Sequence, residues 1–109
     1  MANVYTNAKK NLTNTSATTL YTAPALTTSI IKSILVSEYS GNADTITVTI
    51  TDTASTPVTF SLFKTKAIGA NVTTELLTSP LIVRTGEIIK ITAATANRLQ
   101  VVASILEIS

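Results

Sequence analysis

Residues 44–53 read DTITVTITDT, the most regular alternation in the chain. Apolar β-branched residues occupy one parity of the stretch: Ile46, Val48 and Ile50. Threonine occupies the other parity: Thr45, Thr47, Thr49 and Thr51. Such alternation predicts a β-strand with one buried face and one exposed face. The exposed face carries no charge before Asp52, so we interpret it as a neutral surface that lies against a neighbouring subunit.

The composition favours the same fold class along the whole chain. The chain has 109 residues, which suits one domain, and 13% of them are charged, well below the roughly 25% of ordinary soluble domains. Threonine supplies much of the polar surface instead, and as a β-branched residue it favours strands. These features predict an all-β domain with a mostly neutral surface.

Strand-like segments recur along the chain, separated by turn signals. We expect strands in these ranges: 18–22, 29–37, 44–53, 58–62, one or two within 73–83, 88–92 and 98–108. Short strands with a turn about every ten residues predict an antiparallel β-sandwich that is jelly-roll-like. The expected core residues are Leu20, Ile34, Ile46, Val48, Ile50, Phe60, Leu62, Ile89, Ile91, Val101 and Ile105.

The N-terminal segment differs from the rest of the chain. It is polar, with three isolated apolar residues: Val4, Tyr5 and Leu12. Because so few apolar residues cannot form a core, we expect an extended N-terminal arm at residues 1–17 and a β-sandwich domain at residues 18–109. We expect this arm to bind a partner through three residues: Lys9, Lys10 and Leu12.

The segment 98–108 fits both types of regular structure. Some of its apolar residues satisfy helical spacing: Leu99, Val102, Ala103 and Leu106. Its β-branched residues favour a strand, which is our prediction. One face of that strand carries Leu99, Val101, Ala103 and Ile105. The other face carries Val102, Leu106 and Ile108, and it needs a cover, either a neighbouring subunit or the chain's own arm.

The residue types that most enzymes and metal sites use are missing from the composition. The chain has no histidine and no cysteine, which removes common metal ligands, general bases and thiol nucleophiles. Most carboxylates fall at turns and strand ends, where a solvated group is the default. The turn at residues 41–44 offers oxygen ligands for calcium, but a hairpin turn is the simpler explanation. The sequence therefore predicts a non-enzymatic protein with no catalytic residues, no metal and no cofactor.

Nucleic-acid binding and membrane insertion are not predicted either. The net charge is +2, and the cations cluster no further than the pair Lys9 and Lys10. No segment approaches the about 18 apolar residues of a membrane span. We therefore expect a protein that stays in a cytoplasm-like compartment until it meets its partner.

Residues 20–52, LYTAPALTTSIIKSILVSEYSGNADTITVTITD, resemble small virion proteins of tailed bacteriophages. The shared features are an L-Y-T-x-P start, an apolar strand with a Lys-Ser pair, a Ser-Gly-x-Ala turn and a Thr/Val-alternating strand. Two later segments extend the resemblance, the turn at residues 85–88 and the closing strand at residues 99–107. The resemblance covers residues 18–108 in order, with little insertion.

The resemblance implies a structural role in the virion. Proteins of this family are β-sandwiches that decorate or cement heads, or sit in tails and connectors, usually as symmetric oligomers. It implies a capsid decoration or cement protein that binds and stabilises the shell of the major capsid protein, with a homotrimer favoured. Such a protein is assembled in the host cytoplasm and located in the virion.

The expected interface combines the arm, the threonine face and the second apolar face of the last strand. Its residues are Lys9, Lys10, Leu12, Thr45, Thr47, Thr49, Thr51, Val102, Leu106 and Ile108. Two alternatives stay open. One is a tail, adaptor or fibre-associated structural protein, which shares the fold. The other is a carbohydrate-binding module, which normally presents exposed aromatic rings.

Overall fold

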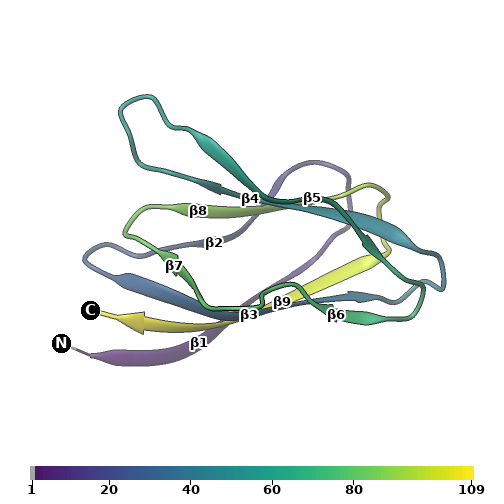
Figure 1. Ribbon diagram of the computed structural model, residues 1–109, viewed down its shortest axis with the longest axis horizontal. Coiled ribbons are helices and arrows are strands. Elements are labelled where there is room, and N and C mark those ends of the chain that lie inside the picture. Colours follow the sequence, from purple (N-terminus) through teal and green to yellow (C-terminus); the bar gives the residue numbers. More distant parts are fainter. Residues whose placement is uncertain (1) are drawn as a thin grey trace.

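The computed structural model describes residues 2–109 as two antiparallel β-sheets packed face to face (Figure 1). The strands are Asn3–Asn11 (β1), Thr18–Thr22 (β2), Thr28–Glu38 (β3), Asp44–Thr51 (β4), Thr59–Ile68 (β5), Thr73–Glu75 (β6), Leu81–Val83 (β7), Ile88–Ala93 (β8) and Leu99–Ile108 (β9). The prediction of an all-β sandwich is confirmed, and the segment that also fitted a helix is strand β9. The described residues contain no helix of the length and hydropathy that crossing a membrane requires.

Strands that precede β4 pair in reverse order with strands that follow β5, so the β4–β5 hairpin is the innermost pair. The first sheet has the order β1-β9-β3-β6, with β7 also paired to β3, and the second sheet has the order β2-β8-β4-β5. Thus β3 pairs with β6 and β7, β2 pairs with β8, and β1 pairs with β9. With β6 and β7 taken as two halves of one interrupted strand, this is the jelly-roll arrangement.

The core lies between the two sheets and follows the predicted alternation. On β4, Ile46 and Val48 are fully buried, whereas the threonines between them are half-buried on the outer side. Most of the expected core residues are buried: Leu20, Ile34, Ile46, Val48, Ile89, Ile91, Val101 and Ile105. Ile50 and Leu62 are partly buried and pack against this core.

Phe60 lies outside the core, contrary to the prediction. Its side chain is 52% exposed. It pairs with Ile50 near the end of the β4–β5 hairpin, and Figure 1 shows this hairpin projecting beyond the sandwich at top left. The register between β4 and β5 also shifts twice around Val48. Because the hairpin extends past the sandwich here, the Phe60 side chain stays largely exposed.

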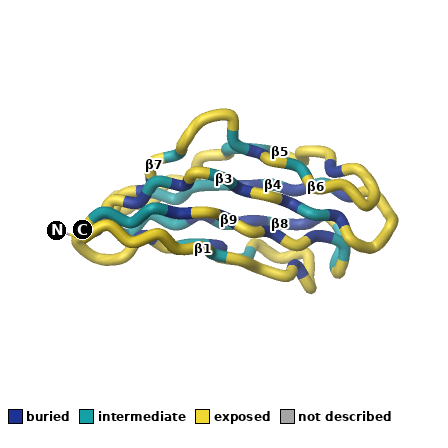
Figure 2. The backbone as a smooth tube through the Cα atoms, turned by 90° about the horizontal axis from the view of Figure 1, so that it is seen from below, coloured by how far each residue is buried: buried dark blue, intermediate teal, exposed yellow. Residues whose placement is uncertain are grey.

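The segment that we expected to be a separate arm belongs to the sandwich. Its residues Asn3–Asn11 are strand β1, which pairs with β9 over its whole length. Leu12 directly follows this strand, is 1% exposed and lies in the core. Figure 2 shows β1 as a mostly exposed strand along the side of the sheet, next to β9. The expected boundary near residue 17 therefore separates two parts of one β-sandwich.

Candidate interaction surfaces

The outer face of the first sheet carries a continuous row of apolar side chains. Register places Leu106 of β9 between Tyr5 of β1 and Ile30 of β3. It places Ile82 of β7 on the other side of Ile30. The two ends of the row are open to solvent, since Tyr5 is 75% exposed and Ile82 is 51% exposed. We call this set the apolar row: Tyr5, Leu106, Ile30 and Ile82.

A second group of apolar residues lies on the same face, and Asn7, Ser104 and Ser33 separate it from the apolar row. Val102 of β9 lies between Lys9 of β1 and Leu35 of β3, and both Val102 and Leu35 are exposed. Ile108 follows Leu106 on the same side of β9 and is half-buried. The three residues predicted for the second face of this strand, Val102, Leu106 and Ile108, therefore do share one outer face. Strand β1 lies beside β9 in the sheet, so it does not cover that face.

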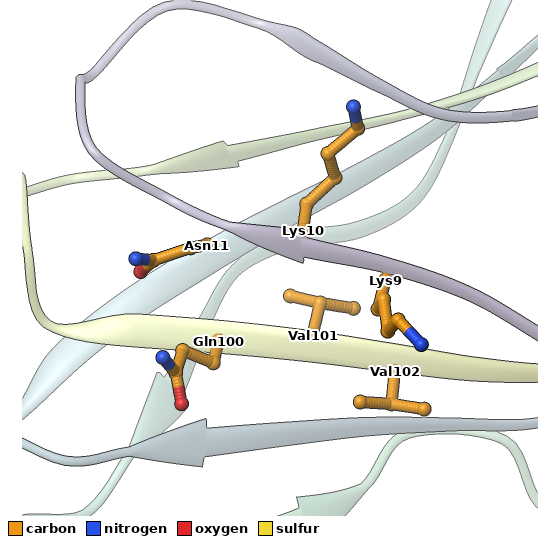
Figure 3. A pocket seen from close by; sticks show the side chains of 6 residues that line it. All are labelled: Lys9, Lys10, Asn11, Gln100, Val101 and Val102. Carbon is orange, nitrogen blue, oxygen red and sulfur yellow. The ribbon is translucent and has the colours of Figure 1, made fainter.

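Lys9 and Lys10 lie at a shallow hollow near the end of β1. The hollow has a volume of about 280 Å³, and its lining residues are Lys9, Lys10, Asn11, Gln100, Val101 and Val102. Figure 3 shows Lys9 beside Val102, whereas Lys10 points to the opposite side of the strand. The two lysines therefore do not form one cationic site, and only Lys9 borders the apolar residues of the outer face.

Positive charge also borders the apolar row. The Nζ atom of Lys32 on β3 lies 5.8 Å from the centroid of the Tyr5 ring, which is a cation–π distance.

Glu75 lies opposite Leu35, and its carboxylate already accepts three hydrogen bonds. The donors are the Ser33 hydroxyl and the N–H groups of Ile34 and Leu77. Burial alone would raise the pKa of Glu75, but these hydrogen bonds lower it.

The threonine face lies on the outer side of the second sheet. Its members are Thr45, Thr47, Thr49 and Thr51, all half-buried. The Thr51 hydroxyl lies 2.9 Å from that of Thr59 on β5, and the Thr47 hydroxyl accepts a 3.0 Å hydrogen bond from the N–H of Thr65. Thr49 lies opposite Lys90 of β8, so the face is not free of charge. Its hydroxyls are therefore partly used within the sheet, and the lack of charge on β4 does not require a partner.

The three groups of predicted interface residues do not form one site. The threonine face and the residues Val102, Leu106 and Ile108 lie on opposite outer sides of the sandwich. Leu12 lies in the core, so it is not available to a partner. Sequence reasoning also missed the residues that neighbouring strands add to this face: Tyr5, Ile30, Leu35 and Ile82. The sequence indicated only Ile30 and Leu35 of this set, because residues 29–37 carry apolar residues on both parities.

A polar cluster joins the two sheets at one end of the sandwich. The hydroxyl of Tyr21 on β2 donates to Oε2 of Glu107 on β9 at 2.5 Å, and the Ser29 hydroxyl of β3 lies 2.6 Å from the Tyr21 oxygen. Burial and the hydrogen bond to Glu107 raise the pKa of Tyr21 to about 12. No spacing in the sequence predicted this cluster, because its members are far apart along the chain.

A buried carboxylate holds two loops together at the other end of β3. Glu38 is 3% exposed, and its oxygens accept hydrogen bonds from the N–H groups of Ser40, Gly41 and Asn71 at 2.8, 2.9 and 3.0 Å. The Ser40 hydroxyl is a fourth donor at 2.5 Å. Burial opposes ionisation, but these donors lower the pKa of Glu38 to about 2. This carboxylate therefore links two loops through hydrogen bonds. Its position near a turn had suggested a solvated group instead.

The described residues contain no group of three or more His, Cys, Asp or Glu side chains that could hold a metal ion. Asp44, in the turn considered for calcium, instead accepts a 3.1 Å hydrogen bond from the N–H of Thr95. The features that stand out are therefore surfaces: the apolar outer face of the first sheet and the edge strand β1 beside it.

Comparisons with known proteins bear on the fold. No protein-family model matches the chain, and no curated protein matches it either. A chain in the structure of infectious bursal disease virus, Gt strain, is similar in structure, with a TM-score of 0.52 and 12% sequence identity. The match covers 98% of this chain and 30% of the viral chain, so this chain spans about a third of that one. At this identity the likeness shows the fold: a viral chain contains the same β-sandwich.

Proposed function

We propose that the protein is a non-enzymatic structural component of a virion, and that it decorates or cements a bacteriophage head by binding the major capsid protein. Its outer apolar face is the observation that carries the proposal. The occurrence of the same fold in a virus structure and the resemblance to small phage virion proteins support a particle as the setting. The apolar row supplies the contact surface.

The exposed apolar residues favour an interface over a bare surface. Contiguous apolar patches on soluble proteins mark interaction sites, whereas single exposed apolar residues do not. Four strands contribute to the apolar row, and Val102 and Leu35 add a second apolar group on the same face. Full burial of a large apolar side chain gains about 1.5–3 kcal/mol, so covering these half-exposed ones gains roughly 1 kcal/mol each.

Charge on this face supports a partner of complementary chemistry. Lys9 and Lys32 border the apolar residues, while Glu75 is already bonded within the chain. A complementary surface is therefore apolar in the centre and carries carboxylates at its rim. The proposal thus predicts an acidic rim on the part of the shell that receives this protein.

A binding experiment with a matched pair of variants tests the proposal. Leu106→Asp and Thr49→Asp each place one carboxylate at a half-buried outer position of a central strand, on opposite faces. We expect Leu106→Asp to bind shells that lack this protein at least about tenfold more weakly than wild type, because it charges the apolar face. Thr49→Asp should bind like wild type.

Thermal melting controls for folding, and Val102→Ser replaces Leu106→Asp if the latter melts well below wild type. Equal shell binding by both aspartate variants would overturn the assignment of the apolar face. The same assay run on separated heads and tails distinguishes the decoration proposal from a tail, adaptor or fibre component: binding to tails alone supports the alternative.

The third candidate, a carbohydrate-binding module, has less support on this face. Tyr5 is an exposed ring of the kind that can stack on a sugar, but Lys32 lies over it. Its neighbours along the row, Leu106, Ile30 and Ile82, are aliphatic and offer no side-chain hydrogen bonds to hydroxyls. The face therefore suits an apolar partner better than a sugar.

A further inference from the structure

Strand β1 exposes one unpaired side of its backbone. Within the described residues, β9 is its only paired neighbour. Ala2 and Ser109 exchange two backbone hydrogen bonds of 3.0 Å, and the N–H of Leu12 donates to the carbonyl of Leu99 at 3.0 Å. Hydrogen-bonded and non-bonded positions alternate in an antiparallel pair, so the even-numbered residues of β1 face β9. The residues that direct their N–H and C=O groups to the open side are Asn3, Tyr5, Asn7, Lys9 and Asn11.

The other sheet edges carry features that hinder pairing. Strand β2 is five residues long and has a register shift at Leu20. Strand β5 has two register shifts and a positive φ of 50° at Thr65, which lies between Lys64 and Lys66. Strands β6 and β7 are three residues long each, with Pro80 before β7. Short length, irregular register, lysine and proline are the means by which edge strands avoid pairing with other chains.

Strand β1 lacks most of these features. It is nine residues long, keeps one unbroken register with β9 and contains no proline. Its two lysines both lie near its C-terminal end. We propose that β1 pairs antiparallel with β1 of a second copy of this chain, with Asn7 opposite Asn7, so that two first sheets join into one continuous sheet. This inference goes beyond the virion role and does not depend on which particle the protein joins.

The proposed register keeps the lysines of the two copies apart. With Asn7 on the two-fold axis, Lys9 of each copy faces Tyr5 of the other, and Lys10 faces Val4. The two copies of Lys9 are then about 14 Å apart along the strands at about 3.4 Å per residue, beyond the screening length of about 8 Å. Centring the pairing on Lys9 instead would bring like charges directly opposite each other, which is destabilising.

The register also pairs the N–H and C=O groups on the open sides of the two β1 strands. Each pair of odd-numbered residues exchanges two hydrogen bonds, so full overlap of Asn3–Asn11 yields about ten bonds between copies. That number is typical of a specific protein interface. A shift by one residue would place odd-numbered residues opposite even-numbered ones, whose amides are already bonded to β9.

The dimer would place both apolar rows on the same side. A two-fold axis perpendicular to the joined sheet keeps the outer faces of the two copies together, with their Tyr5 residues near the centre. A contact of β1 with itself closes after two copies, so it differs from the homotrimer that the resemblance implies. The number of copies in solution therefore decides between the two arrangements.

Single-cysteine variants test the register directly, since the chain has no cysteine of its own. Directly opposite residues of a hydrogen-bonded pair have Cα atoms about 5.5 Å apart, within the usual range for a disulfide. We expect Asn7→Cys to form a covalent dimer under mild oxidation. The matched control, Asn11→Cys on the same exposed edge, should stay monomeric on a non-reducing gel, because its two copies would lie about 27 Å apart.

Sedimentation at micromolar concentration tests the contact without cross-linking. Wild type should sediment as a dimer. Asn7→Pro should weaken the dimer about thirtyfold or more, because it removes two hydrogen bonds across the axis. It should fold normally, since proline is tolerated where the N–H points away from the sheet. Melting temperature and circular dichroism check its folding, and Asn7→Lys, which opposes two charges, serves in its place if Asn7→Pro misfolds.

Three outcomes would overturn the proposal: a monomeric or trimeric wild type, equal cross-linking of Asn7→Cys and Asn11→Cys, or dissociation caused by Leu106→Asp rather than by Asn7→Pro. The last outcome would assign self-association to the apolar face. Asn7→Pro leaves the apolar row, Val102 and Leu35 unchanged, so loss of the dimer with retained shell binding separates this inference from the proposed function.

Discussion

The two outer faces of the sandwich, both predicted from the sequence to lie against a partner, differ in how far neighbouring strands already bond or cover their side chains. On the second sheet, the hydroxyls of Thr47 and Thr51 already bond to neighbouring strand β5. On the first sheet, no described segment lies over the apolar row, and within residues 2–109 the edge strand beside it pairs only with β9. Of the two faces, the threonine face therefore has less need of a partner, because its own sheet already bonds part of its polar groups.

The physical reason lies in the side chains. A threonine hydroxyl can bond to water or to the next strand, so its exposure costs little. An exposed Leu or Ile has no such option, and only another apolar surface removes it from water. A neutral polar face is therefore a weak sign of a partner, whereas apolar residues on both parities of a strand are a stronger one.

A substitution on the inner side of β4 should have the largest effect on the free energy of unfolding, and the effects on the outer faces are compared with it. Ile46→Ala removes a fully buried side chain between the threonines and should lower the free energy of unfolding by about 2–5 kcal/mol. Phe60→Ala, on the projecting hairpin, should cost less than about 1 kcal/mol. Denaturant unfolding measures both, and similar losses would mean that the hairpin packs on the sandwich.

The link between the sheets should matter more than either outer face. Tyr21→Phe removes a hydroxyl bonded to Glu107 and Ser29, and we expect a loss of about 1–3 kcal/mol at neutral pH. The pKa of Tyr21 is raised from 10.0 to about 12, so its contribution is complete below pH 10 and disappears as the pH rises through 12. Unfolding measured from pH 9 to 12 should therefore converge for wild type and Tyr21→Phe. Parallel curves would rule out this coupling.

The stabilising effect of the Glu38 carboxylate at the end of β3 should instead be lost in acid. The pKa of Glu38 is lowered from 4.5 to about 2, so its stabilising effect is complete above pH 4.5 and is lost as the pH falls through 2. Glu38→Gln, which cannot ionise, should lose less stability than wild type over this interval. Thermal melting at several pH values checks this, with Glu87→Gln as a control for carboxylates in general. An equal acid response of wild type and Glu38→Gln would contradict it.

The threonine face itself should show the smallest effect. Thr51→Val keeps the shape and β-branching of the side chain and removes one hydroxyl that bonds to Thr59 across the strands. Exposed cross-strand pairs of this kind contribute about 0.2–1 kcal/mol, so the melting temperature should change little. Shell binding should not change. A marked loss of binding would return the threonine face to the interface and remove the distinction between the two outer faces.

Strand segments were predictable because burial imposes a pattern on the residues, either alternation as in residues 44–53 or apolar residues on both parities as in residues 29–37. Residues 44–53 gave strand β4, residues 29–37 gave β3, and the parity of residues 98–108 gave both faces of β9. The same parity rule placed Phe60 in the core, where it failed, because parity fixes the side of a strand and not whether an opposing sheet is present. The exposed residues of the candidate surface were predicted only where one strand contained them, as with Val102, Leu106 and Ile108.

The fold class, the positions of most strands and most of the core residues were predictable from the sequence, because alternation and turn chemistry are local. The edge strand at residues 3–11 was not predictable, since β1 is held by backbone hydrogen bonds to β9 and has almost no buried face to leave a pattern. The row of Tyr5, Leu106, Ile30 and Ile82 likewise depends on the assembled sheet, because strands far apart in the chain meet in a register that no local spacing encodes.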